Sequence, residues 1–132
     1  MNLSNWMADT MLNQAFRGVD YTWPDTVYLA LYTTDPTKAD TGTEVSGNGY
    51  ARQEIPFSAP ELDAGQRTIM NDEEIQFPVA TGGNWGAITH VGIRTAATGG
   101  QLMMSGPLQS PRTINAGERF IVLVENGKLR LD

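Results

Sequence analysis

Residues 27–33 read Val-Tyr-Leu-Ala-Leu-Tyr-Thr, and this stretch decides the class of fold that the sequence predicts. At alternate positions Val27, Leu29 and Leu31 lie on one side of an extended chain, and the side chains between them are also largely apolar. A strand that is apolar on both faces is typical of the interior of a sheet. Pro24 disfavours helix at the residue before it, so the strand is expected to follow a break in the chain.

Similar short runs recur along the chain at intervals of about ten residues, a spacing typical of sandwiches and barrels. Two pairs of runs are joined by turn signals, Gly99-Gly100 in the first and Asn126-Gly127 in the second, and each predicts a hairpin. No helix alternates with the strands as in a parallel sheet. We therefore expect a mostly β fold, an antiparallel β-sandwich or barrel-like domain, with strands at 27–33, 50–57, 68–71, 75–77, 87–95, 102–105, 119–125 and 128–131.

The first 18 residues contain the one substantial helix that the sequence predicts. Apolar side chains from Leu3 to Phe16 recur at helical spacing. Asn2 or Ser4 can cap the start, and Gly18 stands where a left-handed C-terminal cap would be. Such a helix is expected to cover one end of a sheet. The expected organisation is one domain over 1–132, with the helix at 1–18 and the antiparallel β domain at 19–132.

A long polar stretch near 34–49 separates the first two strands. It contains several glycines and Asp35-Pro36, with almost no large apolar side chain. Loops of this length are usually functional or are ordered by a partner. We therefore expect this loop, together with the first helix, to contact other proteins.

The overall charge bears on the kind of partner. The chain has 9 Lys and Arg against 15 Asp and Glu, a net charge of −6, and the basic residues are scattered. Nucleic-acid binding needs a concentrated basic surface and is not expected. No apolar run is long enough to span a bilayer or to form a signal core, so we expect no membrane contact and synthesis in the cytoplasm.

Candidate catalytic groups are few. There is no cysteine, which excludes a disulfide framework and a thiolate site. His90 is the one histidine, and Thr89 beside it is expected on the opposite face of the strand. The cluster Asp72, Glu73 and Glu74 is expected at a solvated turn. We predict no enzymatic activity, no catalytic residue and no cofactor.

Asp35, Asp40 and Glu44 could offer three oxygen ligands to a cation, but they do not follow the EF-hand pattern, so no metal site is predicted. The aromatic side chains could stack on a sugar ring; packing in a core or an interface is the more common use of such rings. The candidate interface residues are Trp6, Trp23, Asp35, Asp40, Glu44, Tyr50 and Trp85.

Several segments, in the same order and over nearly the whole chain, resemble a group of small tailed-bacteriophage virion proteins often labelled tail-fibre-like, which are structural or decoration-type proteins. The sequence differs from that group around 61–72 and at 128–132. The matching segments are 12–18 (Leu-Asn-Gln-Ala-Phe-Arg-Gly), 21–22 with Pro24, 26–36, 42–53, 75–78, 85–93 and 97–102.

The resemblance implies a structural component of the virion. We expect an accessory protein on the particle exterior, a capsid decoration or cement protein or the base of a head spike. The alternative is a tail-fibre or baseplate adaptor that contributes to host attachment. This alternative predicts that exposed aromatics such as Trp85 or Trp23 engage a ligand. A cell-wall hydrolase is a third hypothesis, without a catalytic constellation to support it. The expected partners are the major capsid protein or tail and baseplate proteins, and further copies of the same chain.

Overall fold

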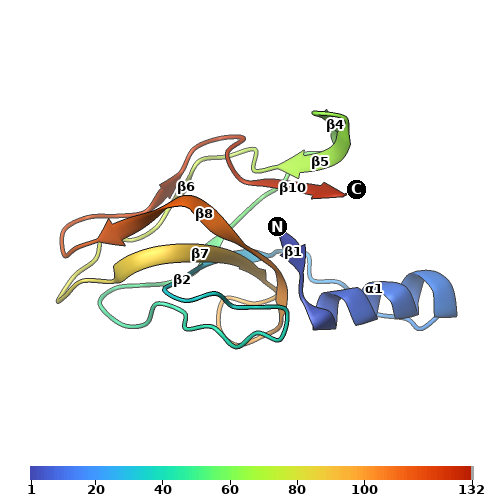
Figure 1. Cartoon of the computed structure of the whole chain (residues 1–132), viewed down its shortest axis with the longest axis horizontal. Helices are drawn as coiled ribbons and strands as arrows, with labels where there is room; N and C mark the ends of the chain where they lie inside the picture. Colours follow the sequence, from blue (N-terminus) through green and yellow to red (C-terminus); the bar gives the residue numbers. More distant parts are fainter. Residues whose placement is uncertain (132) are drawn as a thin grey trace.

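The computed structural model describes residues 1–131 and shows a chain dominated by strands, with 38% of the residues in strands and 10% in helix. All strand pairings among these residues are antiparallel. The prediction of a mostly β antiparallel fold with one N-terminal helix is confirmed, and the sheets do not close into a barrel. Figure 1 shows two smaller sheets lying over one face of a larger one.

The larger sheet has five strands in the order β1-β8-β7-β2-β3. Its members are β1 (Asn2–Leu3), β2 (Tyr28–Tyr32), β3 (Gln53–Glu54), β7 (Gly86–Arg94) and β8 (Leu102–Ile114). Strand β2 pairs on both sides and is buried on both faces, which confirms the interior position predicted for it. The turn at Gly99-Gly100 joins β7 to β8 as predicted. The two-residue strand β1 was not predicted, and β8 extends well beyond the expected 102–105.

A register shift between β7 and β8 changes which side chains reach the core. Ile88 pairs with Arg112, whereas His90 pairs with Pro107. Simple alternation would place Ile88 opposite Val91 and Ile93, but the irregularity at Thr89 brings all three to one apolar cluster. This cluster lies between the larger sheet and the smaller ones.

The smaller sheets contain β10-β5-β4 and β6-β9. Their members are β4 (Glu61–Asp63), β5 (Gln66–Met70), β6 (Ile75–Gln76), β9 (Ile121–Val122) and β10 (Lys128–Leu131). The predicted hairpin at Asn126-Gly127 is wrong, because β9 pairs with β6 and β10 pairs with β5. A hairpin over 61–70, turning at Ala64-Gly65, occupies part of a segment that was expected to be loop. The strands expected at 50–57 and 119–125 shrink to β3 and β9.

The helix α1 (Asn5–Arg17) has the predicted ends. Ser4 caps it, since its hydroxyl accepts a hydrogen bond from the Met7 amide at 3.0 Å, and Gly18 follows in the left-handed region with φ 67°. No residue of α1 is buried, and its main contact is with β8. The helix points away from the sheets (Figure 1) and so covers less of them than predicted. It is too short and too polar to cross a membrane, as is every helix within 1–131.

Candidate interaction site

Arg52 and Arg94, here called the arginine pair, fasten the long polar loop to the rest of the domain. Arg52 makes two parallel hydrogen bonds to Glu44, Nε to Oε2 and Nη2 to Oε1, both at 2.8 Å. Its third nitrogen donates to the carbonyl oxygens of Ala96 and Gly99 at 2.8 and 2.9 Å. Arg52 thereby links the loop to the turn between β7 and β8 with a fork geometry that lysine does not offer.

Arg94 makes the second link. Its Nη1 donates to Asp40 Oδ1 at 2.9 Å and to the Tyr32 hydroxyl at 3.0 Å, and its Nη2 donates to the Gly100 carbonyl at 3.0 Å. Gly92 leaves room for the Tyr32 ring, because a Cβ at that position would lie 2.9 Å from Tyr32 Cε1. The polar loop is therefore held by its own chain at both Asp40 and Glu44.

The charges of this network stabilise one another. Burial alone would raise the pKa of the Glu44 carboxyl, but hydrogen bonds from Arg52 and Tyr50 outweigh burial, and the pKa lies below its ordinary value. The hydrogen bonds to Glu44 raise the pKa of Arg52 despite its burial. Burial, followed by the bond to Glu44, raises the pKa of Tyr50, so this hydroxyl stays protonated and donates at 2.6 Å.

The three acidic residues considered as cation ligands do not converge. Asp40 and Glu44 each face an arginine, whereas the side chain of Asp35 is 62% exposed and accepts a hydrogen bond from the Thr37 amide at 2.9 Å. Within residues 1–131 no group of three or more acidic, histidine or cysteine side chains is placed to hold a metal ion. The loop carboxylates are used mainly to anchor the loop.

Thr89 and His90 do not lie on opposite faces, and that expectation is wrong. Thr89 Oγ1 and His90 Nδ1 are 2.8 Å apart at the irregularity in β7, and Nε2 lies 3.9 Å from Asp35 Oδ1. The latter distance is too long for a hydrogen bond. The cavities around 55–57, 67–69 and 120–130 are not lined by Asp35, Thr89 or His90.

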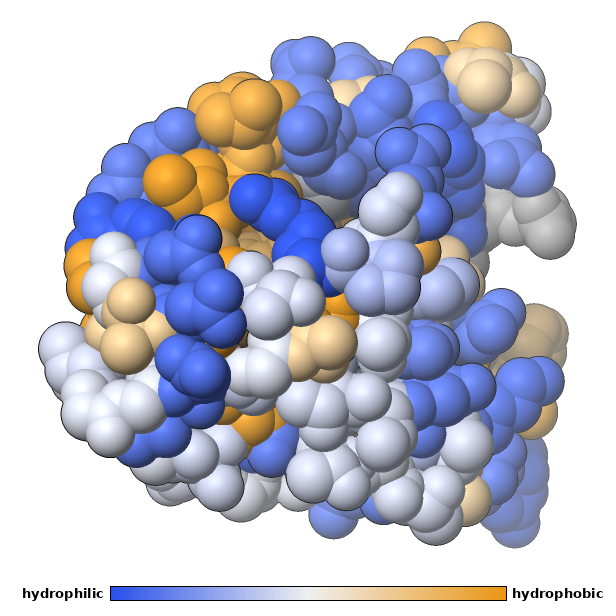
Figure 2. All heavy atoms as spheres, turned by 60° about the vertical axis from the view of Figure 1, so that its left-hand side comes forward, coloured by the Kyte–Doolittle hydropathy of each residue, from blue (hydrophilic) through white to orange (hydrophobic). Residues whose placement is uncertain are grey.

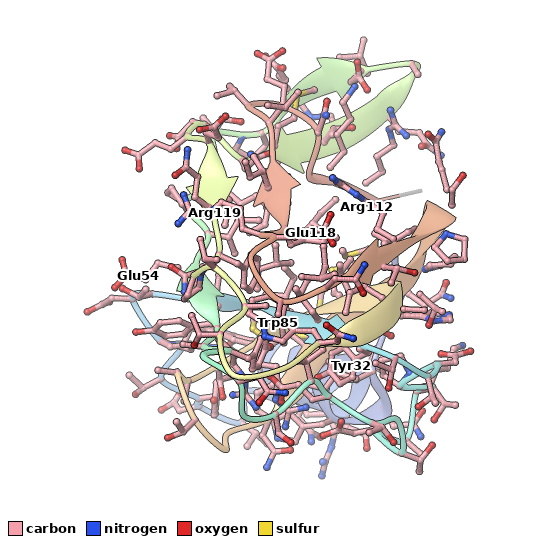
Figure 3. All side chains as sticks on the ribbon, turned by 90° about the vertical axis from the view of Figure 1, so that its left-hand side faces the viewer. Tyr32, Glu54, Trp85, Arg112, Glu118 and Arg119 are labelled. Atoms are coloured by element: carbon pink, nitrogen blue, oxygen red, sulfur yellow. The ribbon has the colours of Figure 1, made fainter. Side chains whose placement is uncertain are left out.

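Tyr50 and Trp85 were predicted at an interface, and the structure places Trp85 in the core with the partly buried Tyr50 packed against it. Their rings meet edge to face at 5.4 Å, and Phe77 packs against both. Trp85 is 6% exposed, and its Nε1 donates to the Asn48 carbonyl at 2.9 Å. Figure 3 shows Trp85 in the interior, while Arg112 and Arg119 flank the β6–β9 pair. The expectation that Trp85 is exposed to a ligand is therefore wrong.

Trp6, Tyr21 and Trp23 form an aromatic cluster against α1. Their ring centroids are 4.8 to 6.3 Å apart, all edge to face, and all three side chains are half-buried. Gln14 fixes the cluster, because its Oε1 accepts from Trp23 Nε1 and its Nε2 donates to the Tyr21 carbonyl. The predicted residues Trp6 and Trp23 thus meet beside the helix, far from Trp85 in sequence.

The helix separates two apolar surfaces that sequence reasoning missed. The first, the apolar groove, has a volume of about 330 Å³ and is lined by residues of α1, β1 and β8 on one side and of β5 and β10 on the other. The methionines within 7–11 and 103–104 could have indicated this groove in the sequence, because Met side chains adapt to irregular apolar surfaces. Its lining includes Leu3, Met7, Met11, Met103, Met104 and Leu129, together with Arg67 and Arg130.

The second surface, the helix ridge, consists of Leu12, Phe16 and Val19. These side chains are 56%, 82% and 47% exposed. Leu62, Leu123 and Val124 are further exposed apolar side chains outside the ridge. Figure 2 shows that hydrophobic side chains also gather in the upper left of the face it presents. Patches of this kind mark sites of protein–protein contact.

A small β-rich chain whose carboxylates anchor its own loop, and whose large apolar side chains remain exposed, has the features of a subunit in a larger assembly. The family model described as Podophage GP4 fiber I protein gp80 matches residues 2–131. The chain belongs to this family and is a structural fibre protein of a bacteriophage, which confirms the resemblance found in the sequence. Membership implies a place in the virion. No curated protein matches the chain.

Proposed function

We propose that the protein is a tail-fibre subunit or baseplate adaptor that contributes to host attachment by binding other virion proteins, and that it catalyses no reaction. The family description names a fibre protein and supports this alternative over the capsid decoration that the sequence first suggested. The partners in this proposal are tail and baseplate proteins together with other fibre subunits.

The helix ridge is the observation that carries the proposal. Phe16 is 82% exposed at the end of a helix that buries none of its residues. Covering a Phe or Leu side chain fully is worth about 1.5–3 kcal/mol, so an isolated chain would forgo this stabilisation at two positions of one helix. A partner protein that covers the ridge recovers it.

The polar side chains support a structural role. Glu44, Tyr50 and Arg52 have shifted pKa values and are hydrogen-bonded to one another, as are Tyr32 and Arg94, and both sets hold the loop. The pKa of Asp63 is lowered as well, by its hydrogen bond from Arg130. Side chains with shifted pKa values often mark an active site, but ion-pair networks within a fold shift pKa values too. Here each perturbed group already has its partner in the chain.

Comparing phage particles with and without this chain by cryo-electron microscopy tests the proposal. We expect the deletion to remove density from the tail or baseplate, to leave the capsid lattice and packaged DNA unchanged, and to lower adsorption to host cells. Density lost from the capsid surface, with normal adsorption, would refute the proposal. Turnover of cell-wall polysaccharide by the purified protein would refute the absence of catalysis.

A further inference from the structure

A second cavity, here called the bulge cavity, opens between β8 and the segment that runs from β9 to β10. Its volume of about 760 Å³ lies within the range of pockets that bind small molecules. Its floor is apolar and its mouth is polar, as is common in such pockets. Buried and half-buried side chains form the floor: Leu29, Ile55, Val91, Ile93 and Leu129. Exposed side chains form the mouth: Gln109, Ser110, Arg112, Glu125 and Asn126.

A bulge in β8 places two polar side chains at this mouth. Because of the register shift between β7 and β8, residues 108–111 have no pairing partner in β7. Leu108 packs against the core and anchors the bulge, while Gln109 and Ser110 are exposed. Neither of these two side chains is hydrogen-bonded to any residue within 1–131. Bulges often redirect side chains next to functional sites, and this one presents a free amide and a free hydroxyl to the cavity.

Arg112 adds an unpaired positive charge to the mouth. Its guanidinium lies over the Phe120 ring, 4.9 Å from the ring centroid, and its Nη1 makes one long hydrogen bond of 3.5 Å to the Ile121 carbonyl. No carboxylate of the described chain lies within ion-pair distance of it. Figure 3 shows Arg112 beside the β6–β9 pair. The guanidinium is thus held from one side and can offer its other nitrogens to an anion as a planar fork.

The opposite wall of the bulge cavity is held by Asn71. The Glu125 amide donates to the Asn71 carbonyl at 3.0 Å, and the Gly127 amide donates to Asn71 Oδ1 at 2.7 Å. Glu125 adopts φ 69°, a conformation that few residues other than Gly, Asn and Asp take up. The side chains of Glu125 and Asn126 form no hydrogen bond with the part of the chain that the structure describes. This wall therefore offers a carboxylate and an amide on a fixed backbone.

The charge around the bulge cavity is opposite in sign to that of the whole chain. Three of the nine Lys and Arg residues line it, Arg112, Lys128 and Arg130, against one acidic residue, Glu125. Lys128 and Arg130 share the carboxylate of Asp63, at 3.6 and 2.6 Å. Three positive and two negative charges leave one positive charge here, in a chain whose net charge is −6. This cavity therefore attracts an anionic ligand, although the chain as a whole repels one.

We propose that the bulge cavity binds an acidic saccharide whose carboxylate or phosphate group is held by Arg112. Sugar hydroxyls both donate and accept hydrogen bonds, so they match the amides, hydroxyl and carboxylate at the mouth, and the C–H face of a sugar ring can pack on the apolar floor. A simple anion would leave the floor uncovered. A fatty acid would leave the polar groups of Gln109, Ser110 and Glu125 without partners. The inference goes beyond the proposed function, because it gives the chain a small-molecule ligand and holds wherever on the particle the chain is located.

Titration of the isotope-labelled full chain with saccharides, followed by the chemical shifts of its backbone amides, tests the proposal. Trigalacturonic acid supplies carboxylates, glucose 6-phosphate supplies a phosphate, and maltotriose is the neutral control; an array of acidic and neutral bacterial saccharides widens the set. We expect acidic members to shift the amide signals of 106–112 and 121–130 at millimolar concentration. They should bind at least tenfold more tightly than neutral ones, because only they pair with the unpaired arginine.

Substitutions at the mouth test the residues. Arg112→Gln should weaken binding of the acidic saccharides at least tenfold, and Arg112→Lys, which keeps the charge but loses the fork, should weaken it less. Arg119→Gln is the matched control, since Arg119 is also exposed, makes one side-chain hydrogen bond, to Gln76, and lies outside the cavity. Ser110→Trp should block the mouth and abolish binding while Arg112 stays in place. Far-UV circular dichroism and thermal unfolding establish that each variant is folded.

Several results would overturn the proposal. These are the absence of binding by every acidic saccharide, equal binding of acidic and neutral saccharides, and equal effects of Arg112→Gln and Arg119→Gln. Inorganic phosphate that shifts the same signals as strongly as the saccharides would show a simple anion site, and tighter binding of lauric acid would show a lipid site; either result overturns the assignment to a saccharide. None of these outcomes depends on adsorption to the host or on the position of the chain in the particle, so this inference and the proposed function can fail separately.

Discussion

Asn71 and Gly127 are 56 residues apart in the chain and are joined by two hydrogen bonds. The Gly127 amide donates to Asn71 Oδ1 at 2.7 Å, and the Asn71 amide donates to the Gly127 carbonyl at 3.1 Å. Asn71 is fully buried, and its Nδ2 also donates to the carbonyls of Glu73 and Leu123, both at 2.9 Å. One side chain thus holds the segment between β9 and β10 across two sheets.

Asn71→Ala should lower the free energy of unfolding by about 3 kcal/mol. The substitution leaves three backbone groups without their side-chain partner, and each lost bond costs about 1 kcal/mol. Urea unfolding monitored by circular dichroism measures the change. Asn126→Ala is the control, since Asn126 is exposed in the same segment and its loss should cost less than about 0.5 kcal/mol. Equal stabilities of the two variants would contradict the role given to Asn71.

Glu44→Gln should lower stability at neutral pH by about 2 kcal/mol, because it removes the charge that accepts from Arg52 and Tyr50. In the folded chain the pKa of Glu44 lies below its ordinary value. The stabilisation is therefore fully present above about pH 5 and is lost as the pH falls through the folded pKa. The unfolding free energies of wild type and variant should converge as the pH falls below about 5 and through the folded pKa of Glu44. A gap that stays constant with pH would show that the carboxylate charge is not its source.

Asp40→Asn should loosen the polar loop without unfolding the protein. Asparagine tolerates the left-handed conformation of Asp40, whose φ is 57°, so the substitution removes the charge and keeps the backbone. The pair with Arg94 is partly exposed and contributes about 1 kcal/mol, which corresponds to roughly fivefold faster trypsin cleavage after Lys38. Asp35→Asn is the control and should leave the cleavage rate unchanged, because the Asp35 side chain is largely exposed.

Trp85→Ala and Trp23→Ala should differ in stability although both remove a tryptophan. Trp85 fills the core between Tyr50 and Phe77, so its loss should cost about 3–5 kcal/mol. Trp23 is half-buried, and its loss should cost about 1 kcal/mol from ring contacts within the aromatic cluster. Thermal unfolding of both variants checks the order. If Trp85→Ala were as stable as wild type, the core position of Trp85 would be wrong.

Ala64→Asn should stabilise the β4–β5 hairpin. Ala64 and Gly65 form its two-residue turn with φ of 52° and 81°, and Ala64 is under strain there because L-residues other than Asn and Asp disfavour positive φ. Asn before Gly suits this turn and should add about 0.5–1 kcal/mol to the free energy of unfolding. Ala59→Asn, in the preceding exposed loop and without positive φ, should show no gain.

Local signals in the sequence were sufficient for the fold class and for several element boundaries. The alternation in 27–33 predicted an interior strand, Ser4 and Gly18 marked the two ends of α1, and Gly99-Gly100 marked the hairpin of β7 and β8. Each of these features depends on residues within a few positions of one another, so a short window contains the physical cause. The resemblance to phage virion proteins was likewise present in the order of the segments and is confirmed by the family match.

Contacts between distant residues were decided only in three dimensions. Asn126-Gly127 has the composition of a hairpin turn, yet Gly127 is hydrogen-bonded to Asn71, and the following strand β10 pairs with β5 of another sheet. Asp40 looked like a candidate interface residue, and its partner Arg94 lies 54 positions away. Exposed and buried tryptophans cannot be told apart by residue type, and a groove between α1 and β10 exists only once both ends of the chain meet. Such pairings depend on which surfaces fold against each other, and this is why the sequence predicted the elements better than their partners.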